Sequence, residues 1–283
     1  MSSDSAIVVF ATGKRLHILC SLPEWLPPIH LAGVWSPDSD ERRAAGARYR
    51  VSTADTPEAL LDQCEGAWVL IGGLATERPA VTAIERGLST LAWAPFCAAN
   101  DGAVLRLIDA VGSGTGRWRV AHPHFTRIAC GPPNYGEHRP LPPEAVRLRR
   151  RSTGAATSWD ELYGRAAVAL ASIEGLHPTD DLDVRPTSTS KLLQLEIQLR
   201  AFCGAVTMRF SMGEGPVRNL SVPCGAADAI PNGSDARTTR DWTIDGPDDL
   251  VQTARRHLIN DCATDNEGIT ALQLLQSLVR TRR

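Results

Sequence analysis

Lysine is almost missing from this sequence of 283 residues. Of its 30 basic residues only Lys14 and Lys191 are lysines, so the rest are arginines, which keep their proton at neutral pH. A mechanism that needs a catalytic lysine therefore has two candidate positions.

Long apolar runs, paired cysteines and an excess of one charge are also missing. No stretch approaches the roughly 18 consecutive apolar residues of a transmembrane helix, and the chain starts without the basic flank and apolar core of a signal peptide. The 30 basic and 32 acidic residues nearly balance, which argues against a nucleic-acid partner. The seven cysteines are scattered without a C-x-x-C pair, so we interpret them as reduced. We therefore expect a cytoplasmic protein without a membrane or nucleic-acid partner.

The first 121 residues alternate short apolar runs with helix-forming segments. Strands are expected at residues 6–10, 29–35, 67–71, 89–92 and 118–121, with a short one near 50–52. One helix is expected directly after the first strand, a second ends at residue 49, and a third begins at residue 56. Two more are expected over residues 78–86 and 100–111. This alternation predicts an α/β fold whose N-terminal part is a Rossmann-type, doubly wound parallel sheet.

The pattern changes after residue 121. Cys130–Pro143 contains five prolines, which is typical of a loop or crossover. Strands are expected at residues 145–151, 192–199, 205–210 and 217–222, and helices over residues 158–174, 248–258 and 268–279. We therefore predict a dinucleotide-binding Rossmann-like domain over residues 1–121. An α+β substrate and oligomerisation domain with a mainly antiparallel sheet follows over residues 122–283, and is compatible with a homodimer.

The turn after the first strand is a candidate cofactor site. A dinucleotide-binding turn has the pattern G-x-G-x-x-G, so that backbone amides and a helix N-terminus can approach a pyrophosphate. Those positions read Ala11, Gly13 and Leu16, so only the central glycine is present. The candidate residues of this turn are Thr12, Gly13, Lys14 and Arg15. The alternative is a plain strand-to-helix turn without a ligand.

The end of the second strand bears on the form of the cofactor. An acidic residue that would bind a ribose 2′-hydroxyl is absent there; Ser36 takes its place, with Arg42 and Arg43 nearby. A hydroxyl and an arginine suit a 2′-phosphate. If a dinucleotide binds, the sequence therefore predicts NADP(H) rather than NAD(H).

Four short segments follow one another along the chain, and their order can be compared with that in known families. They are Thr12–Arg15 after the first strand, Gly33–Asp38 at the end of the second, Ala83–Gly87, and Pro95. In this order, over essentially the whole chain, the sequence resembles the Gfo/Idh/MocA oxidoreductases. The segments most similar to thiazolinyl imine reductases of that family are Ile84–Gly87, Ala121–Phe125 and Trp159–Ile173. The resemblance implies NADPH-dependent reduction of a carrier-bound thiazoline in secondary-metabolite biosynthesis, with Pro95 beside the cofactor.

The chain departs from that family at its catalytic positions. Members carry Glu-Lys-Pro after the fourth strand, and the imine reductases carry Glu-His-Pro, whereas this chain has Trp93-Ala94-Pro95. The family's Asp-x-x-x-His pair falls on Ile173 and His177, so only the histidine remains. We place Trp93 and His177 in the substrate pocket and seek the proton donor elsewhere.

His122 and His124 are the candidate catalytic residues, because they directly follow the strand predicted at residues 118–121. In the imine reductases this segment carries a tyrosine implicated in proton transfer, and His122 falls at or beside it. Histidine can donate a proton at neutral pH. Tyr135, in the proline-rich segment that follows, could line the same pocket. The alternative is a pair of loop histidines that hydrogen-bond to the backbone.

Three functions fit these observations. The first is an NADP(H)-dependent reductase of a C=N or C=O bond, acting on a small-molecule or carrier-protein-bound substrate. The second keeps the fold but performs a non-redox step such as a cyclisation. The third is a nucleotide-sensing or regulatory subunit. No metal is expected at the site.

Overall fold

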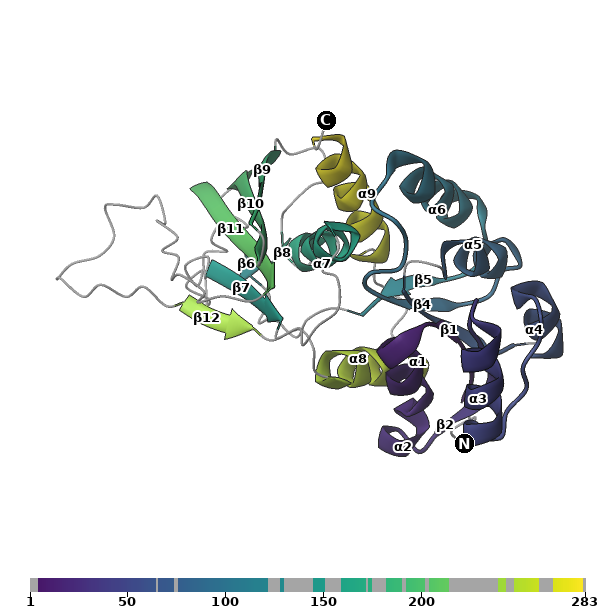
Figure 1. Ribbon diagram of the computed structural model, residues 1–283. Helices are drawn as coiled ribbons and strands as arrows, with labels where there is room; N and C mark the ends of the chain where they lie inside the picture. The colour runs from purple at the N-terminus through teal and green to yellow at the C-terminus, as the bar shows by residue number, and fades with distance from the viewer. Residues whose placement is uncertain are drawn as a thin grey trace, which may run out of the picture.

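The protein forms two five-stranded sheets with helices packed around and between them (Figure 1). The computed structural model describes residues 5–64, 66–73, 76–121, 128–129, 145–150, 159–171, 173–174, 182–189, 192–201, 204–213, 239–242, 247–259 and 267–281. All statements below refer to these residues.

The N-terminal sheet is parallel and has the strand order β2-β1-β3-β4-β5. Its strands are β1 (Ser5–Ala11), β2 (Ile29–Trp35), β3 (Trp68–Gly72), β4 (Thr90–Trp93) and β5 (Trp118–Val120). The predicted α/β Rossmann-type fold is confirmed. The short strand expected near residues 50–52 is reduced to a single parallel bridge between Gly33 and Ser52.

Helices cover both faces of this sheet, because both faces of its strands are apolar. The connecting helices are α1 (Gly13–Cys20), α2 (Leu22–Trp25), α3 (Ser39–Tyr49), α4 (Pro57–Gln63), α5 (Glu77–Glu85) and α6 (Asp101–Ser113). Side chains of β1 alternate between two cores: Ile7 and Val9 pack with α1, whereas Val8 and Phe10 pack with the residues of α4 to α6. Thr56 and Asn100 cap α4 and α6 through their side chains, as their positions predict.

The second sheet has the order β12-β7-β11-β10-β9. Its strands are β7 (Ala145–Arg150), β9 (Leu182–Ser188), β10 (Leu192–Ala201), β11 (Gly204–Gly213) and β12 (Thr239–Trp242). β9, β10 and β11 pair antiparallel, in agreement with the mainly antiparallel sheet that was expected, but β7 and β12 join in parallel, so the sheet is mixed. β9 and β12 were not among the expected strands. The strand expected at residues 217–222 lies outside the described residues.

One helix of the second half ends earlier than expected. α7 covers Trp159–Ala171 rather than extending to residue 174. The reason is non-local: β8 (Ile173–Glu174) pairs in parallel with β6 (Ile128–Ala129).

The two halves pack against each other through both hydrophobic cores. α7 lies between the sheets in Figure 1 and contacts β10 and β11 as well as α9 (Glu267–Arg280). α9 in turn packs on β5 and α6 of the first sheet, and the Trp118 indole donates a hydrogen bond of 3.2 Å to the carbonyl of Gly268. On the opposite face, α8 (Pro247–Ala254) and the π-helical turn η2 (Arg255–Ile259) contribute to the core around α1. The boundary predicted at residue 121 stays a prediction.

None of the helices in these described ranges is long and apolar enough to cross a membrane.

Candidate functional site

The carboxyl ends of the five parallel strands meet at one edge of the first sheet. In an open α/β sheet, ligands bind at this edge, where the strand order reverses. With the order β2-β1-β3-β4-β5, that point lies between β1 and β3. Thr12 and Gly73 follow these two strands and lie side by side: a Cβ added to Gly73 would be 3.1 Å from Thr12 Oγ1. We therefore take this edge as the candidate site.

The first turn presents the N-terminus of α1 to this edge. Gly13 has φ +58°, in the left-handed region that favours glycine, and no atom outside its chain neighbours lies within 4 Å of its missing Cβ. Thr12 is extended and its side chain makes no capping bond. Lys14 is exposed, whereas Arg15 turns toward the second half of the chain.

A Gly13→Ala variant tests this backbone conformation. We expect the free energy of unfolding in urea to fall by about 1 kcal/mol, because a left-handed conformation costs about that much for a residue with a Cβ. Gly112→Ala, inside α6, is the control, since an added Cβ there also meets open space. That control is expected to stabilise the protein slightly. Equal effects of the two substitutions would contradict the assigned conformation.

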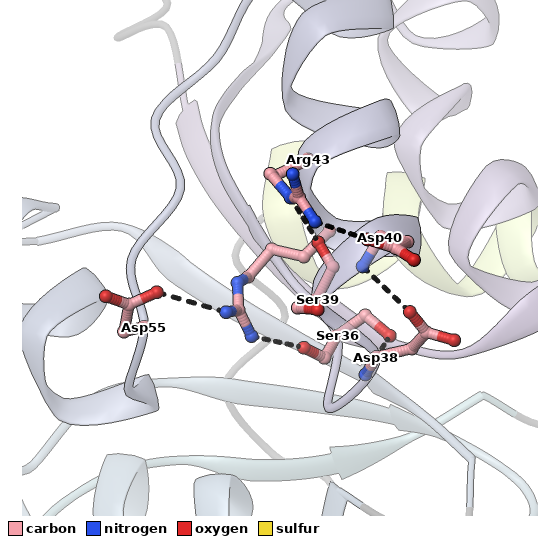
Figure 2. A network of polar contacts seen from close by, with 7 residues as sticks. Ser36, Asp38, Ser39, Asp40, Arg43 and Asp55 are labelled. Carbon is pink, nitrogen blue, oxygen red and sulfur yellow. Dashed lines mark hydrogen bonds and ion pairs between the residues drawn. The ribbon is translucent and has the colours of Figure 1, made fainter.

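At the end of β2, Ser36, Arg42 and Arg43 have hydrogen-bond partners that the sequence did not predict. Ser36 is fully buried, and its hydroxyl donates to Glu41 Oε2 at 2.5 Å. Arg42 Nη1 donates to the Ser36 carbonyl at 2.9 Å, and its Nη2 forms an ion pair with Asp55 at 3.1 Å. The Arg43 guanidinium is hydrogen-bonded to a carboxylate of its own helix turn, that of Asp40 (Figure 2). Arg42 thus lies at the end of β2 and contacts Ser36 through its carbonyl, whereas Arg43 pairs within its own helix.

Glu41 is a site residue that sequence reasoning missed. Its Oε1 accepts a hydrogen bond of 2.6 Å from the Gly13 amide, so one carboxylate joins the first turn to the end of β2. The fingerprint of a dinucleotide-binding fold places an acidic residue at the strand end itself, whereas Glu41 comes from the first turn of α3. The available signal was an acidic residue in that first turn.

The end of β4 carries the replaced catalytic motif. Trp93 and Ala94 are buried, and the carbonyl of Pro95 accepts a hydrogen bond of 2.8 Å from the Gly73 amide. The Ala94-Pro95 peptide bond is cis. Pro95 therefore lies next to the turn after β3, at the edge where it was predicted. The Ala94 methyl group belongs to the main core and offers no proton.

α7 brings a charged cluster to the same edge. Glu161 Oε1 accepts hydrogen bonds from Arg15 Nη2 at 2.8 Å and from Arg165 Nη2 at 2.7 Å. The three side chains keep only 18%, 9% and 7% of their surface exposed for Arg15, Glu161 and Arg165. The Arg15 guanidinium also lies 5.6 Å from the centre of the Trp93 ring, a cation–π contact. We name these four residues the Arg15–Glu161 cluster.

The cluster and its neighbours fix α7 against the first sheet. Asp160 Oδ1 accepts a hydrogen bond of 3.0 Å from the Ala99 amide, in the loop after β4. A Cβ on Gly164 would contact Pro95 at 3.5 Å. Acidic residues are favourable in the first turn of a helix, so the sequence places these two acids where α7 can accept donors from the first half.

Four of the predicted site residues lie outside the described residues. They are His122, His124, Tyr135 and His177. The first member of the family's Asp-x-x-x-His pair was expected at Ile173. This residue lies in strand β8 and not on a helix. Glu161 and Arg165 have the same four-residue spacing on α7 and lie at the site. Arginine keeps its proton, so Arg165 can bind an anion or orient a group but cannot supply a proton.

The described cysteines take no part in this site as nucleophiles. Cys20, Cys64 and Cys97 are free and buried. Burial raises the pKa of the Cys20 thiol to about 12, and it raises the pKa values of Cys64 and Cys97 as well. They are therefore protonated at neutral pH. Within the described part of the chain, no group of three or more metal-binding side chains occurs.

Comparisons with known proteins find similar structures at low sequence identity. No protein-family model matches the sequence, and no curated protein matches it. Biliverdin reductase from Synechocystis, solved with biliverdin and NADP⁺, has a TM-score of 0.61 and 12% identity, over 98% of this chain and 99% of that one. GenD2 from gentamicin A biosynthesis, solved with NAD, has a TM-score of 0.61 and 10% identity, over 99% and 94% of the chains. A Gfo/Idh/MocA family oxidoreductase from Vibrio cholerae has a TM-score of 0.58 and 14% identity, over 98% and 96%.

These matches establish a fold shared over the full length with NAD(P)-binding oxidoreductases of the Gfo/Idh/MocA type. At 10–14% identity they carry the fold alone. The reaction has to be argued from the site.

Proposed function

We propose that this protein is an NAD(P)H-dependent reductase of a C=N or C=O bond, with an imine or thiazoline of secondary metabolism as the favoured substrate class. The observation that carries the proposal is the first turn: a left-handed Gly13 opens α1 at the point where the strand order reverses. Similar structures that were solved with NADP⁺ and with NAD support a dinucleotide at such an edge.

The described residues fit a dinucleotide along this edge. The N-terminus of α1 suits a pyrophosphate, since the helix dipole favours an anion there and Thr12 makes no capping bond; the Gly13 amide itself is bonded to Glu41 Oε1. Ser36 and Glu41 would face the adenine ribose, and Pro95 and Trp93 would border the nicotinamide. The dinucleotide would supply the hydride, and the protein would supply position and a proton.

The proton donor is the least usual part of this proposal. At the family's lysine position Ala94 has no ionisable group, so we assign the donation to His122, directly after β5 and Ala121. His124 is its neighbour, and Tyr135 and His177 complete the proposed pocket. The same proposal includes a substrate that is either a small molecule or bound to a carrier protein. It also includes a homodimeric assembly.

A nucleotide-sensing or non-redox role is the second candidate. The observation that favours it is the replacement of the catalytic motif by Trp93 and Ala94, beside arginines that hold their protons. Such a site can bind a dinucleotide and change its contacts with a partner without transferring a hydride.

Two measurements separate these functions. In the first, the purified protein is titrated with NADH and with NADPH, and the nicotinamide fluorescence is followed. We expect saturable enhancement with at least one of them, whereas no binding of either would reject the proposal. In the second, a panel of cyclic imines and thiazolines is added to the complex. Oxidation of the bound dinucleotide supports a reductase, and binding without oxidation supports the sensing role.

A further inference from the structure

The Arg15 side chain leaves the first turn and crosses the end of β3. Gly72 is the last residue of that strand, and a Cβ added to it would lie 3.4 Å from Arg15 Cδ and 3.6 Å from Arg15 Cβ. A larger residue at this position would block the path of the arginine. Beyond Gly72, the guanidinium lies 5.6 Å from the centre of the Trp93 ring and donates to Glu161 Oε1. Arg15 thus carries its charge from the start of α1 to the end of β4.

The guanidinium of Arg15 reaches the part of the edge where the proposed function places the nicotinamide. Trp93 ends β4, and Pro95 lies so close to α7 that a Cβ on Gly164 would contact it at 3.5 Å. In the proposed function, Trp93 and Pro95 border the nicotinamide, whereas the pyrophosphate faces the N-terminus of α1. A substrate group that Arg15 holds at this place would therefore lie beside the bond that is reduced.

The Arg15–Glu161 cluster contains two guanidinium groups and one carboxylate. Arg15 Nη2 and Arg165 Nη2 donate to the same oxygen, Glu161 Oε1, at 2.8 and 2.7 Å. A guanidinium has five N–H donors in one plane, so one carboxylate oxygen cannot satisfy two of these groups. Buried charges are costly unless opposite charges are paired with them, and a carboxylate brought by a ligand would pair with the second guanidinium. Arg15 is the member that a ligand can reach, because 18% of its side chain is exposed against 7% for Arg165.

We propose that Arg15, supported by Arg165, binds a free carboxylate of the substrate. The inference rests on the proposed function and narrows it, because the substrate is then an acid and not a thioester of a carrier protein. A carboxylate can accept two N–H groups from one guanidinium fork and brings the missing negative charge. A thioester brings no charge and accepts weakly. The Trp93 ring beside the guanidinium favours its cationic plane and limits where the carboxylate can bind.

The test compares the binding of a thiazoline carboxylic acid with that of its primary amide and of its thioester. The amide has nearly the shape of the acid without its charge, and the thioester represents the carrier-bound form. Dissociation constants are measured by isothermal titration calorimetry, with and without NADH or NADPH. The proteins are the unaltered chain, Arg15→Met, Arg15→Lys and the control Arg48→Met, each shown by thermal melts to be folded. Arg48 is a matched control because it also lies over an aromatic ring, that of Tyr49 at 5.3 Å, but on the exposed surface of α3.

We expect the unaltered chain and Arg48→Met to bind the acid about tenfold or more tightly than the amide or the thioester. This is the change in affinity that a hydrogen bond to a charged group typically produces. Arg15→Met should lose that ratio. Arg15→Lys should keep part of it, because lysine has the charge without the fork.

Three results would overturn the carboxylate site alone. They are equal binding of acid and amide or no binding of either, tighter binding of the thioester, and an unchanged acid-to-amide ratio in Arg15→Met. If Arg15→Met leaves that ratio unchanged and weakens dinucleotide binding instead, Arg15 serves the pyrophosphate. If no protein binds either dinucleotide, the proposed function fails, and the titrations without dinucleotide still decide whether Arg15 binds the carboxylate.

Discussion

Glu161→Gln is expected to lower the free energy of unfolding by about 3 kcal/mol. The substitution leaves Arg15 and Arg165 close together without the carboxylate that both now contact. Removing one partner from a buried ion pair costs about 3–5 kcal/mol, and the lower end applies because Arg15 keeps 18% of its side chain exposed. Urea unfolding followed by circular dichroism measures the change.

Two further variants sharpen this result. Glu58→Gln is the control, because its partner Arg78 is 83% exposed and such pairs contribute less than about 1 kcal/mol. Glu161→Leu combined with Arg165→Met should recover part of the lost stability, since only one guanidinium then remains without its carboxylate. A loss below about 1 kcal/mol in Glu161→Gln would mean that the cluster is solvated and does not hold α7 in place.

His122→Phe is expected to lower turnover about 100-fold or more, with little change in dinucleotide affinity. General acid catalysis contributes typically 10²–10⁴-fold, and Ala94 cannot replace the lost donor. His124→Ala is the matched comparison and should have a smaller effect. Turnover is measured with the best imine substrate of the panel, on protein whose melting temperature is unchanged. Full activity of His122→Phe would remove His122 from the mechanism, and a large loss of stability with intact turnover would assign it a structural role.

Local sequence signals were sufficient for most of the first sheet. The strand predicted at residues 29–35 has the same limits in the structure, because Ile29, Val34 and Trp35 are buried and turn residues flank the strand. Thr56 and Asn100 cap helices because the short side chain of each reaches the amide three residues on. Such features depend on neighbours in the sequence.

Contacts between distant residues were not accessible in the same way. Glu41 meets Gly13 across 28 positions and Glu161 meets Arg15 across 146, and no periodicity encodes either pair. The end of α7 was placed too late because the residues beyond it pair with β6. Sequence alone does not show the acceptors of Arg42, the Ser36 carbonyl and Asp55, because only the folded chain brings them to its guanidinium.

The position of α9 has a consequence for how the chain is made. Its buried face supplies Ala271, Leu272, Leu275 and Leu278 to the core that also contains Trp118 of β5 and Leu107 of α6. A ribosome produces β1 to β5 long before it produces α9, so this apolar surface stays open to water while the second half is still being synthesised. Until α9 packs against the first sheet, this exposed apolar surface favours aggregation of the growing chain.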